Sequence, residues 1–260
     1  MGTTTRLIWN NWMNSSAASV VASSEDVLAP AMNLVNRDRY VSFYTGYTTV
    51  SPMLINVDLG APRAVDYLGI INFVNRYDPP TGTGPWPASW KVGYQTTPGF
   101  GAITFIGTSQ SIQYQRGDFG FPISRITARY WQFYFTPNVS PGFSLGNLLI
   151  GNLGVDLGMV YSPGATETTQ MNRIRTRSIG GQPTISQPGP SRRFLVLPFN
   201  AINAATLASL KSAIASPTFF YIDHTDKVQE VTLASDKFER THRWNSPALY
   251  DATLELEVLP

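Results

Sequence analysis

Apolar residues along this chain of 260 residues come in short bursts and not at helical spacing. From Met53 to about Gly158 the bursts are rich in Val, Ile, Phe, Tyr and Trp and are bounded by Gly, Pro, Asn or Asp, as strands usually are. They read MLINVDLG, YLGIINFV, SWKVGYQ, ITFIGTS, RYWQFYF and LLIGNLGVDLG. None has the length or the period of a helix. Short strands in regular succession predict a β-sandwich or jelly roll.

The pattern changes in the last hundred or so residues of the chain. A segment rich in Thr, Gln, Gly, Pro and Ser holds one polar strand-like piece, Met171–Ser178. RRFLVLPF then predicts a buried strand, and INAATLASLKSAIAS predicts a helix over about 201–216, capped by Asn200 or Asn203. FFYID, KVQEVTLAS and ALYDATLELEV predict three more strands. We therefore expect an all-β protein: a jelly-roll sandwich over 1–160, then a smaller β-sandwich or barrel with one helix over 161–260.

Composition narrows the chemistry that the chain can perform. The absence of Cys removes disulfides, thiolate zinc sites and cysteine nucleophiles. The formal net charge is only +2, so no strong basic field for nucleic acid is indicated. Charged residues make up 14% of the chain, against about 25% in an ordinary domain. Two explanations stay open: an all-β protein with many Gly and Pro turns, or a surface that neighbouring subunits largely cover.

No segment indicates a membrane span or a secretory signal. The N-terminal residues lack the uninterrupted apolar core of a signal peptide. The chain also has no apolar run of about 18 residues. We therefore expect no membrane insertion, while the missing Cys is compatible with any redox compartment.

Several strings over about residues 20–155 resemble the galactose-binding-like jelly roll of the discoidin type. They are EDVLAPAMNLVNRDRYVSFYTG, LINVDLGAPRAVDYLGIINFVN, ASWKVGYQT, ARYWQFYF and LLIGNLGVDLG, in that order. The resemblance implies a jelly roll but carries over no binding residue, because the ligand loops of this family vary most. The terminal Cys pair of secreted members is absent here, which fits a protein from a non-secretory source. Within the DLG string, Asp58 can accept a backbone N–H bond and Gly60 can take a positive φ.

The second half resembles the β-sandwich with a helix found in tail-tube and distal-tail proteins of long-tailed bacteriophages. The similarity rests on the order of elements: FLVLPF before a short helix, then FFYID, and a last strand with alternating Leu and Glu. A jelly roll fused to such a domain resembles distal-tail or other baseplate proteins. These proteins join the tail tube to tip fibres and often carry carbohydrate-binding-like modules.

Candidate catalytic and metal-binding residues all have simpler structural explanations. His224 and His242 lie in polar turn or strand-edge contexts, where a solvated His is expected. Asp223, His224 and Asp226 are close in sequence, but a hairpin turn explains them and no further ligand is evident. The acidic strand residues are expected to face solvent by alternation, and they are Glu230, Glu239, Glu255 and Glu257. We therefore predict no catalytic residue, no metal and no cofactor.

The loop RYDPPTGTGPWPASW is the sharpest candidate for a contact with a glycan or a partner. Its exposed aromatic rings could stack on sugar faces while an arginine bonds hydroxyl groups. We single out Arg76, Tyr77 and Trp86 for this role. Trp90, which begins the WKV strand, is expected in the core.

A second candidate surface contains Arg173, Arg175 and Arg177, which alternate and so share one face of a strand. Nucleic-acid contact is conceivable if a ring of copies lines a DNA channel, although each half of the chain is only +1. Arginine can also protect an exposed edge strand from wrong pairing. We favour an Arg-rich interface between subunits.

Together these features predict a structural virion protein of a long-tailed bacteriophage that forms part of the tail tip or baseplate. It would assemble as a homo-oligomeric ring and dock the tail tube to tip proteins, with tube, hub and fibre proteins as partners. It would be made in the host cytoplasm, and we expect no contact with nucleic acid except with DNA passing through the channel. The alternative is a carbohydrate-binding module that adsorbs to a host glycan. An enzyme ranks third.

Overall fold

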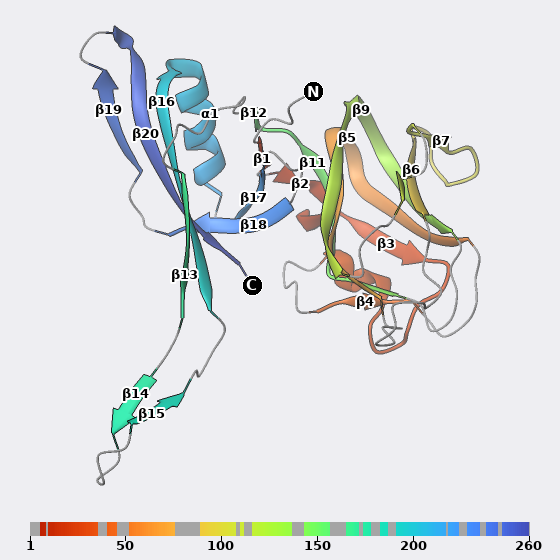
Figure 1. The fold of residues 1–260 in the computed structure, drawn as a ribbon. Helices are drawn as coiled ribbons and strands as arrows, with labels where there is room; N and C mark the ends of the chain where they lie inside the picture. The colour runs from red at the N-terminus through yellow and green to blue at the C-terminus, as the bar shows by residue number, and fades with distance from the viewer. Residues whose placement is uncertain are drawn as a thin grey trace. The chain divides into compact units, whose positions relative to one another are not determined.

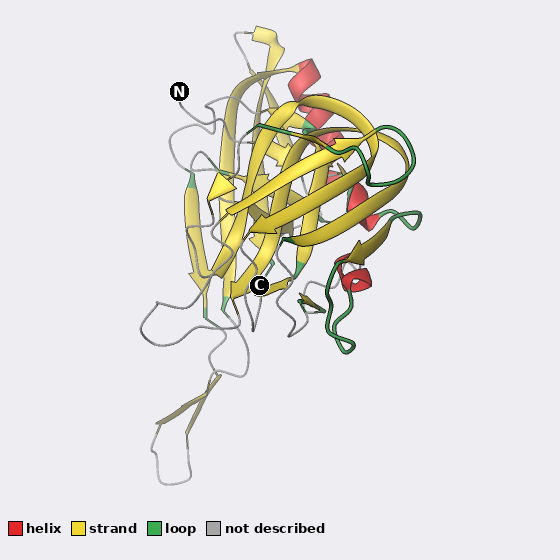
Figure 2. Cartoon of the chain, turned by 90° about the vertical axis from the view of Figure 1, so that its right-hand side faces the viewer, coloured by secondary structure: helices red, strands yellow, loops and turns green. Residues whose placement is uncertain are grey.

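The computed structural model describes two compact units, Asn10–Leu153 and the remainder, 1–9 with 154–260. Strands predominate in both, and the α-helix α1 belongs to the second (Figures 1 and 2). The expected all-β class with a jelly-roll sandwich and one helix is confirmed for the described residues. These are 6–8, 10–35, 41–45, 52–75, 89–107, 110–111, 116–136, 143–156, 165–171, 174–177, 183–186, 191–216, 218–223, 228–234, 238–243 and 246–259.

The Asn10–Leu153 unit is built on one ten-stranded sheet that folds over on itself. Its elements are β2 (Asn10–Asn11), β3 (Ser19–Ala22), β4 (Phe43–Tyr44), β5 (Met53–Asn75), β6 (Ser89–Gln95), β7 (Thr104–Phe105), β8 (Gln110–Ser111), β9 (Arg116–Thr136), β10 (Phe143–Leu145) and β11 (Asn147–Asn152), with short 3-10 helices at Trp12–Asn14 and Ala31–Val35.

Two long bent strands, β5 and β9, create the two layers of this sandwich. They pair from Met53 with Phe135 down to Val74 with Arg116, and the register shifts after Asp58, after Val65 and after Ile70. The first half of β5 lies between β3 and β9, and its second half lies between β11 and β9. The bursts MLINVDLG and YLGIINFV are therefore one strand and not the two that we expected. β5 pairs with β9 on both sides of the bend, so the two bursts are joined by a bend within one strand and not by a hairpin turn.

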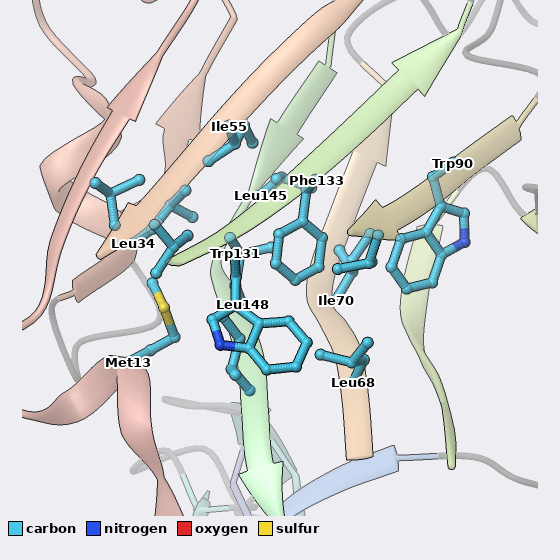
Figure 3. Packing of buried hydrophobic residues seen from close by; sticks show 14 of the residues in the cluster. Met13, Leu34, Ile55, Leu68, Ile70, Trp90, Trp131, Phe133, Leu145 and Leu148 are labelled. Atoms are coloured by element: carbon cyan, nitrogen blue, oxygen red, sulfur yellow. The ribbon is translucent and has the colours of Figure 1, made fainter. Parts of the chain in front are cut away.

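The core of the sandwich combines aliphatic and aromatic side chains from several strands (Figure 3). Trp90 is 2% exposed, stacks on Phe133 at 6.0 Å between ring centroids, and meets Phe119 and Phe121 edge to face at 5.6 and 5.4 Å. Such ring contacts add to the burial of large apolar areas. The prediction that Trp90 belongs to the core is confirmed.

The corner of β5 brings the DLG and ARYW strings together. Gly60 has φ +76° and donates its N–H to Asp58 Oδ1 at 2.8 Å, as expected from the sequence. Asp58 also accepts two bonds from Arg129, from Nε at 2.7 Å and from Nη2 at 2.8 Å. The Arg129 guanidinium holds the pKa of Asp58 below its ordinary value, with a smaller lowering from the Gly60 N–H and an opposing effect of burial.

The second unit is an eight-stranded antiparallel sheet whose core face packs against the helix. Its strands are β1 (Arg6–Ile8), β12 (Val155–Asp156), β13 (Thr166–Gln170), β16 (Arg192–Asn203), β17 (Phe219–Ile222), β18 (Val228–Leu233), β19 (Glu239–Arg243) and β20 (Ser246–Val258). The order is β12-β1-β17-β18-β20-β16-β13, with β19 on β20. The N-terminal strand β1 thus completes the sheet of the C-terminal half. The division into domains at residue 160 stays a prediction.

The helix α1 spans Ala204–Ile214, which lies within the expected range of about 201–216, and it begins after the second of the two expected capping residues. Asn203 caps it, because its Oδ1 accepts the N–H of Thr206 at 2.8 Å. Leu207, Leu210 and Ala213 form its buried face. Ile202, which we assigned to the helix, lies in β16, because the strand resumes after a bulge at Ala201 (φ +59°) and continues up to the capping residue. Within the described residues, no helix is long and apolar enough to cross a membrane.

The corner at Gly60 predicts a large cost for a side chain at this position. A Cβ there would lie 2.6 Å from Ala17 Cβ and 2.8 Å from Ala17 O, in addition to the positive φ. We expect Gly60→Ala to lower the free energy of unfolding by about 2 to 4 kcal/mol in urea denaturation, from backbone strain and overpacking together. Gly107→Ala is the matched control, because Gly107 also has a positive φ, +60°, but open space around it. Equal losses in the two variants would contradict the steric role of Gly60.

The ion pair of Asp58 and Arg129 predicts a pH-dependent contribution to stability. Because the pKa of Asp58 is lowered on folding, the stabilisation is present above the ordinary carboxyl pKa of about 3.9 and is lost as pH falls through the lowered value. The deficit of Asp58→Asn in unfolding free energy should therefore be largest at neutral pH and shrink below about pH 4. The deficit of Arg129→Met in unfolding free energy should shrink over the same pH range. A deficit that stays constant from pH 7 to pH 3 would refute this role.

Candidate functional site

The candidate contact residues from the sequence lie mostly outside the described part of the chain. Arg76, Tyr77, Trp86 and Arg173 are outside it, as is His224. Arg175 and Arg177 lie in the described strand β14 (Ile174–Arg177), of which the backbone alone is described. The proposed glycan or partner contact and the Arg-rich interface therefore stay predictions.

A turn with two exposed apolar residues marks one end of the jelly-roll unit. Val27 is 91% exposed and Leu28 is 93% exposed. The turn is held in place, because Asp26 accepts the N–H of Ala29 with its carbonyl and the N–H of Leu28 with its side chain. Both apolar side chains are thus presented on an ordered turn, and half-exposed Met32 follows close behind in the chain.

Hydrogen bonds connect this turn to the end of the sandwich where the candidate loop begins. Asp26 donates its N–H to Tyr44 O, and Tyr44 pairs with Ser144. Ser144 pairs in turn with Val74, next to the last residue of β5. The last residues of β5, which the predicted contact loop follows in the chain, thus lie at this same end of the sandwich. Sequence reasoning missed Val27 and Leu28, because nothing in the string EDVLAP indicates that its apolar residues face solvent.

The second unit presents an open sheet edge. All five residues of β13, the strand at the end of the sheet order, are exposed. Its one described partner strand is β16, paired from Thr166 with Val196 to Gln170 with Arg192. Arg193 binds Glu167 across the pair through Nε at 2.8 Å and through Nη2. The outer N–H and C=O groups of an edge strand are a template for pairing with another chain.

Past the end of β13 the chain forms a separate two-stranded sheet of β14 and β15 (Pro183–Ser186) before it returns through β16 (Figure 1). In its register Arg175 pairs with Ile185 and Arg177 pairs with Pro183. The strand β14, Ile174–Arg177, lies within the strand-like piece that we expected at Met171–Ser178. A two-stranded ribbon alone is marginally stable in water. We call residues 166–193, from β13 to the start of β16, the arm.

The acidic residues of β20 face away from the core, as their alternation predicts. Leu254 and Leu256 are fully buried, whereas Glu255 is exposed and Glu257 is half-buried. Arg192 at the base of the arm lies 3.6 Å from Glu257. The described residues hold no group of three or more His, Asp or Glu that could bind a metal.

Three solved structures similar to this chain are carbohydrate-binding modules. The family 32 module of Clostridium perfringens NanJ, in complex with galactose, is 17% identical with a TM-score of 0.43, over 57% of this chain and 99% of the module. Chitosan-binding module 1 of a Paenibacillus sp. IK-5 chitosanase/glucanase is 15% identical with a TM-score of 0.44, over 58% and 100%. A Clostridium perfringens CBM32 module in complex with GalNAc-β-1,3-galactose is 12% identical with a TM-score of 0.41, over 52% and 94%.

These similarities cover little more than half of the chain, and at such identities and TM-scores they say nothing about its ligand. No protein-family model and no curated protein matches the sequence.

Proposed function

We propose that this chain is a non-enzymatic structural protein that works by self-assembly, as a ring-forming component of the tail tip or baseplate of a long-tailed bacteriophage. In the virion it would dock the tail tube to tip proteins. The observation that carries the proposal is the arm, which combines a fully exposed edge strand with a ribbon that is a separate sheet.

The edge strand and the ribbon of the arm would both gain stabilising contacts in an assembly that an isolated molecule does not provide. The exposed strand β13 contains neither Pro nor Lys, residues that often protect an edge from pairing. The ribbon beyond it lacks a third strand among the described residues, so the two strands depend on other contacts for lasting order. Contacts with further copies would meet both needs.

The bacteriophage context rests on the resemblance of the second half to tail-tube and distal-tail proteins. The low proportion of charged residues, 14%, supports a surface that neighbouring subunits cover, because the core of a subunit interface is depleted in charge. The proposed role in the tail requires no catalysed reaction.

The arm predicts that its removal yields a monomer. Because Gln170 pairs with Arg192, residues 171–191 can be replaced by Asn-Gly, a two-residue turn that closes β13 onto β16. We expect multi-angle light scattering with size-exclusion chromatography to give a multiple of 28.6 kDa for the full chain and a single-chain mass for the shortened variant. The proposal fails if the full chain and the shortened variant have the same number of chains per particle.

A second candidate function is recognition of a glycan by the jelly-roll unit. The observation that favours it is the turn with Val27 and Leu28, since ordered, exposed apolar groups can pack against the apolar face of a sugar ring. Two of the three similar modules are described in complex with galactose or a galactose-containing disaccharide, so galactosides belong among the glycans on the array.

This candidate predicts that Val27→Ser combined with Leu28→Ser abolishes binding on a glycan array and leaves the unfolding free energy within about 0.5 kcal/mol, because both residues are exposed. Val21→Ser is the control, since Val21 is a 65% exposed valine in the strand β3. The Val21→Ser variant should bind glycans as the full chain does. A full chain that binds no glycan on the array, or a double variant that binds as well as the full chain, would exclude this function for the turn.

A further inference from the structure

Charge is segregated within the second unit, although the unit as a whole is nearly neutral. The arm holds five Arg and one Glu, a formal charge of +4. The rest of the unit holds six basic and nine acidic residues, a formal charge of −3. The near-neutral composition therefore conceals a basic extension on an acidic body.

Two acidic side chains of the body, Glu255 and Glu257, lie on the outer face of its sheet. In the ladder, Glu257 lies opposite Phe194 and Thr232, and Glu255 lies opposite Val196. These residues are on the face opposite the buried Leu254 and Leu256, so they point away from the helix side. Glu255 is exposed, and no described residue forms an ion pair with it.

The base of the arm shows how arginine and glutamate pair in this sheet. Arg192 reaches Glu257 at 3.6 Å on the outer face, and Arg193 binds Glu167 on the other face. Both arginines thus find carboxylates within their own copy. Arg175 and Arg177 lie farther along the arm, in a ribbon that pairs with no other sheet of the described chain.

We propose that the basic arm of one copy docks onto the acidic outer face of β20 in a second copy, with Arg175 and Arg177 near Glu255 and Glu257. This inference rests on the proposed self-assembly and names the surface that receives the arm. The contact is heterologous, because different surfaces of the two copies meet, and repetition of such a contact closes a ring or extends a filament. Opposite charges select the partner and its orientation, and arginine can bind carboxylates with two bonds.

The decisive test is an exchange of charges between the two surfaces. Arg175→Glu with Arg177→Glu, and separately Glu255→Arg with Glu257→Arg, should each weaken association about tenfold or more in light scattering. Mixing the two variants, or combining all four changes in one chain, should restore it. Glu255→Arg alone leaves the ion pair of Glu257 with Arg192 intact. This single variant should also weaken association. Thermal unfolding checks that every variant is folded.

A matched control changes the same amount of charge elsewhere. Arg125 and Lys211 are exposed, so Arg125→Glu with Lys211→Glu should leave association unchanged. The inference is overturned if the arm and face variants associate like the full chain, or if mixing them does not restore association. It is also overturned if arm reversal removes binding to duplex DNA without changing the mass, which would make the arm a nucleic-acid contact.

The arm-shortened variant separates this inference from the proposed function. A shortened chain that dissociates while the charge variants stay assembled leaves self-assembly standing and rejects the acidic face as the docking surface. A shortened chain that keeps its mass rejects self-assembly through the arm altogether.

Discussion

The pairing of β5 with β9 is the constraint on which the jelly-roll unit depends. Each strand runs through both layers, so their register aligns the layers and sets which side chains meet in the core. The bend lies where Gly60 approaches Ala17 too closely for any side chain. Asp58 binds Gly60 on its own strand and Arg129 on the other, and so joins the corner of β5 to β9. The aromatic core around Trp90 then fills the space between the layers.

The second unit solves a different problem, because its sheet is open at the β13 end. Its apolar residues pack on one face under α1, while the other face and the edge carry polar and charged groups. Within this near-neutral unit the arm carries a formal charge of +4 and the remainder a formal charge of −3. In an assembly, the same separation of charge gives each copy two complementary surfaces.

Much of the fold follows from local sequence signals. Bursts of Val, Ile and aromatic residues between turn residues predict the all-β class, and Asn203 with the spacing of Leu207 and Leu210 predicts the helix. The continuity of β5 is not predictable in this way, because a glycine bend and a hairpin turn look alike in sequence. The addition of Arg6–Ile8 to the sheet of the C-terminal half is also invisible, since it depends on contacts between distant parts of the chain.

The candidate sites show the same limit. Alternation correctly places Glu255 and Glu257 on one face of β20, because a strand fixes that relation locally. The exposure of Val27 and Leu28 depends on the hydrogen bond between the turn and Tyr44. The pattern of apolar and polar residues along the sequence does not predict such a contact. Arg129 was likewise visible only as part of a common string, and its role at the β5 corner comes from an ion pair across the sheet.

The central claim is that the arm gains its order from another copy of the chain. Hydrogen exchange of the backbone amides of β13, β14 and β15 tests it most directly, when measured on the full chain at high and at low protein concentration. The account predicts slow exchange in the arm at concentrations where the chain assembles and fast exchange after dilution, while the β5 and β9 amides stay protected throughout. Arm amides that exchange at the same rate at both concentrations would contradict it.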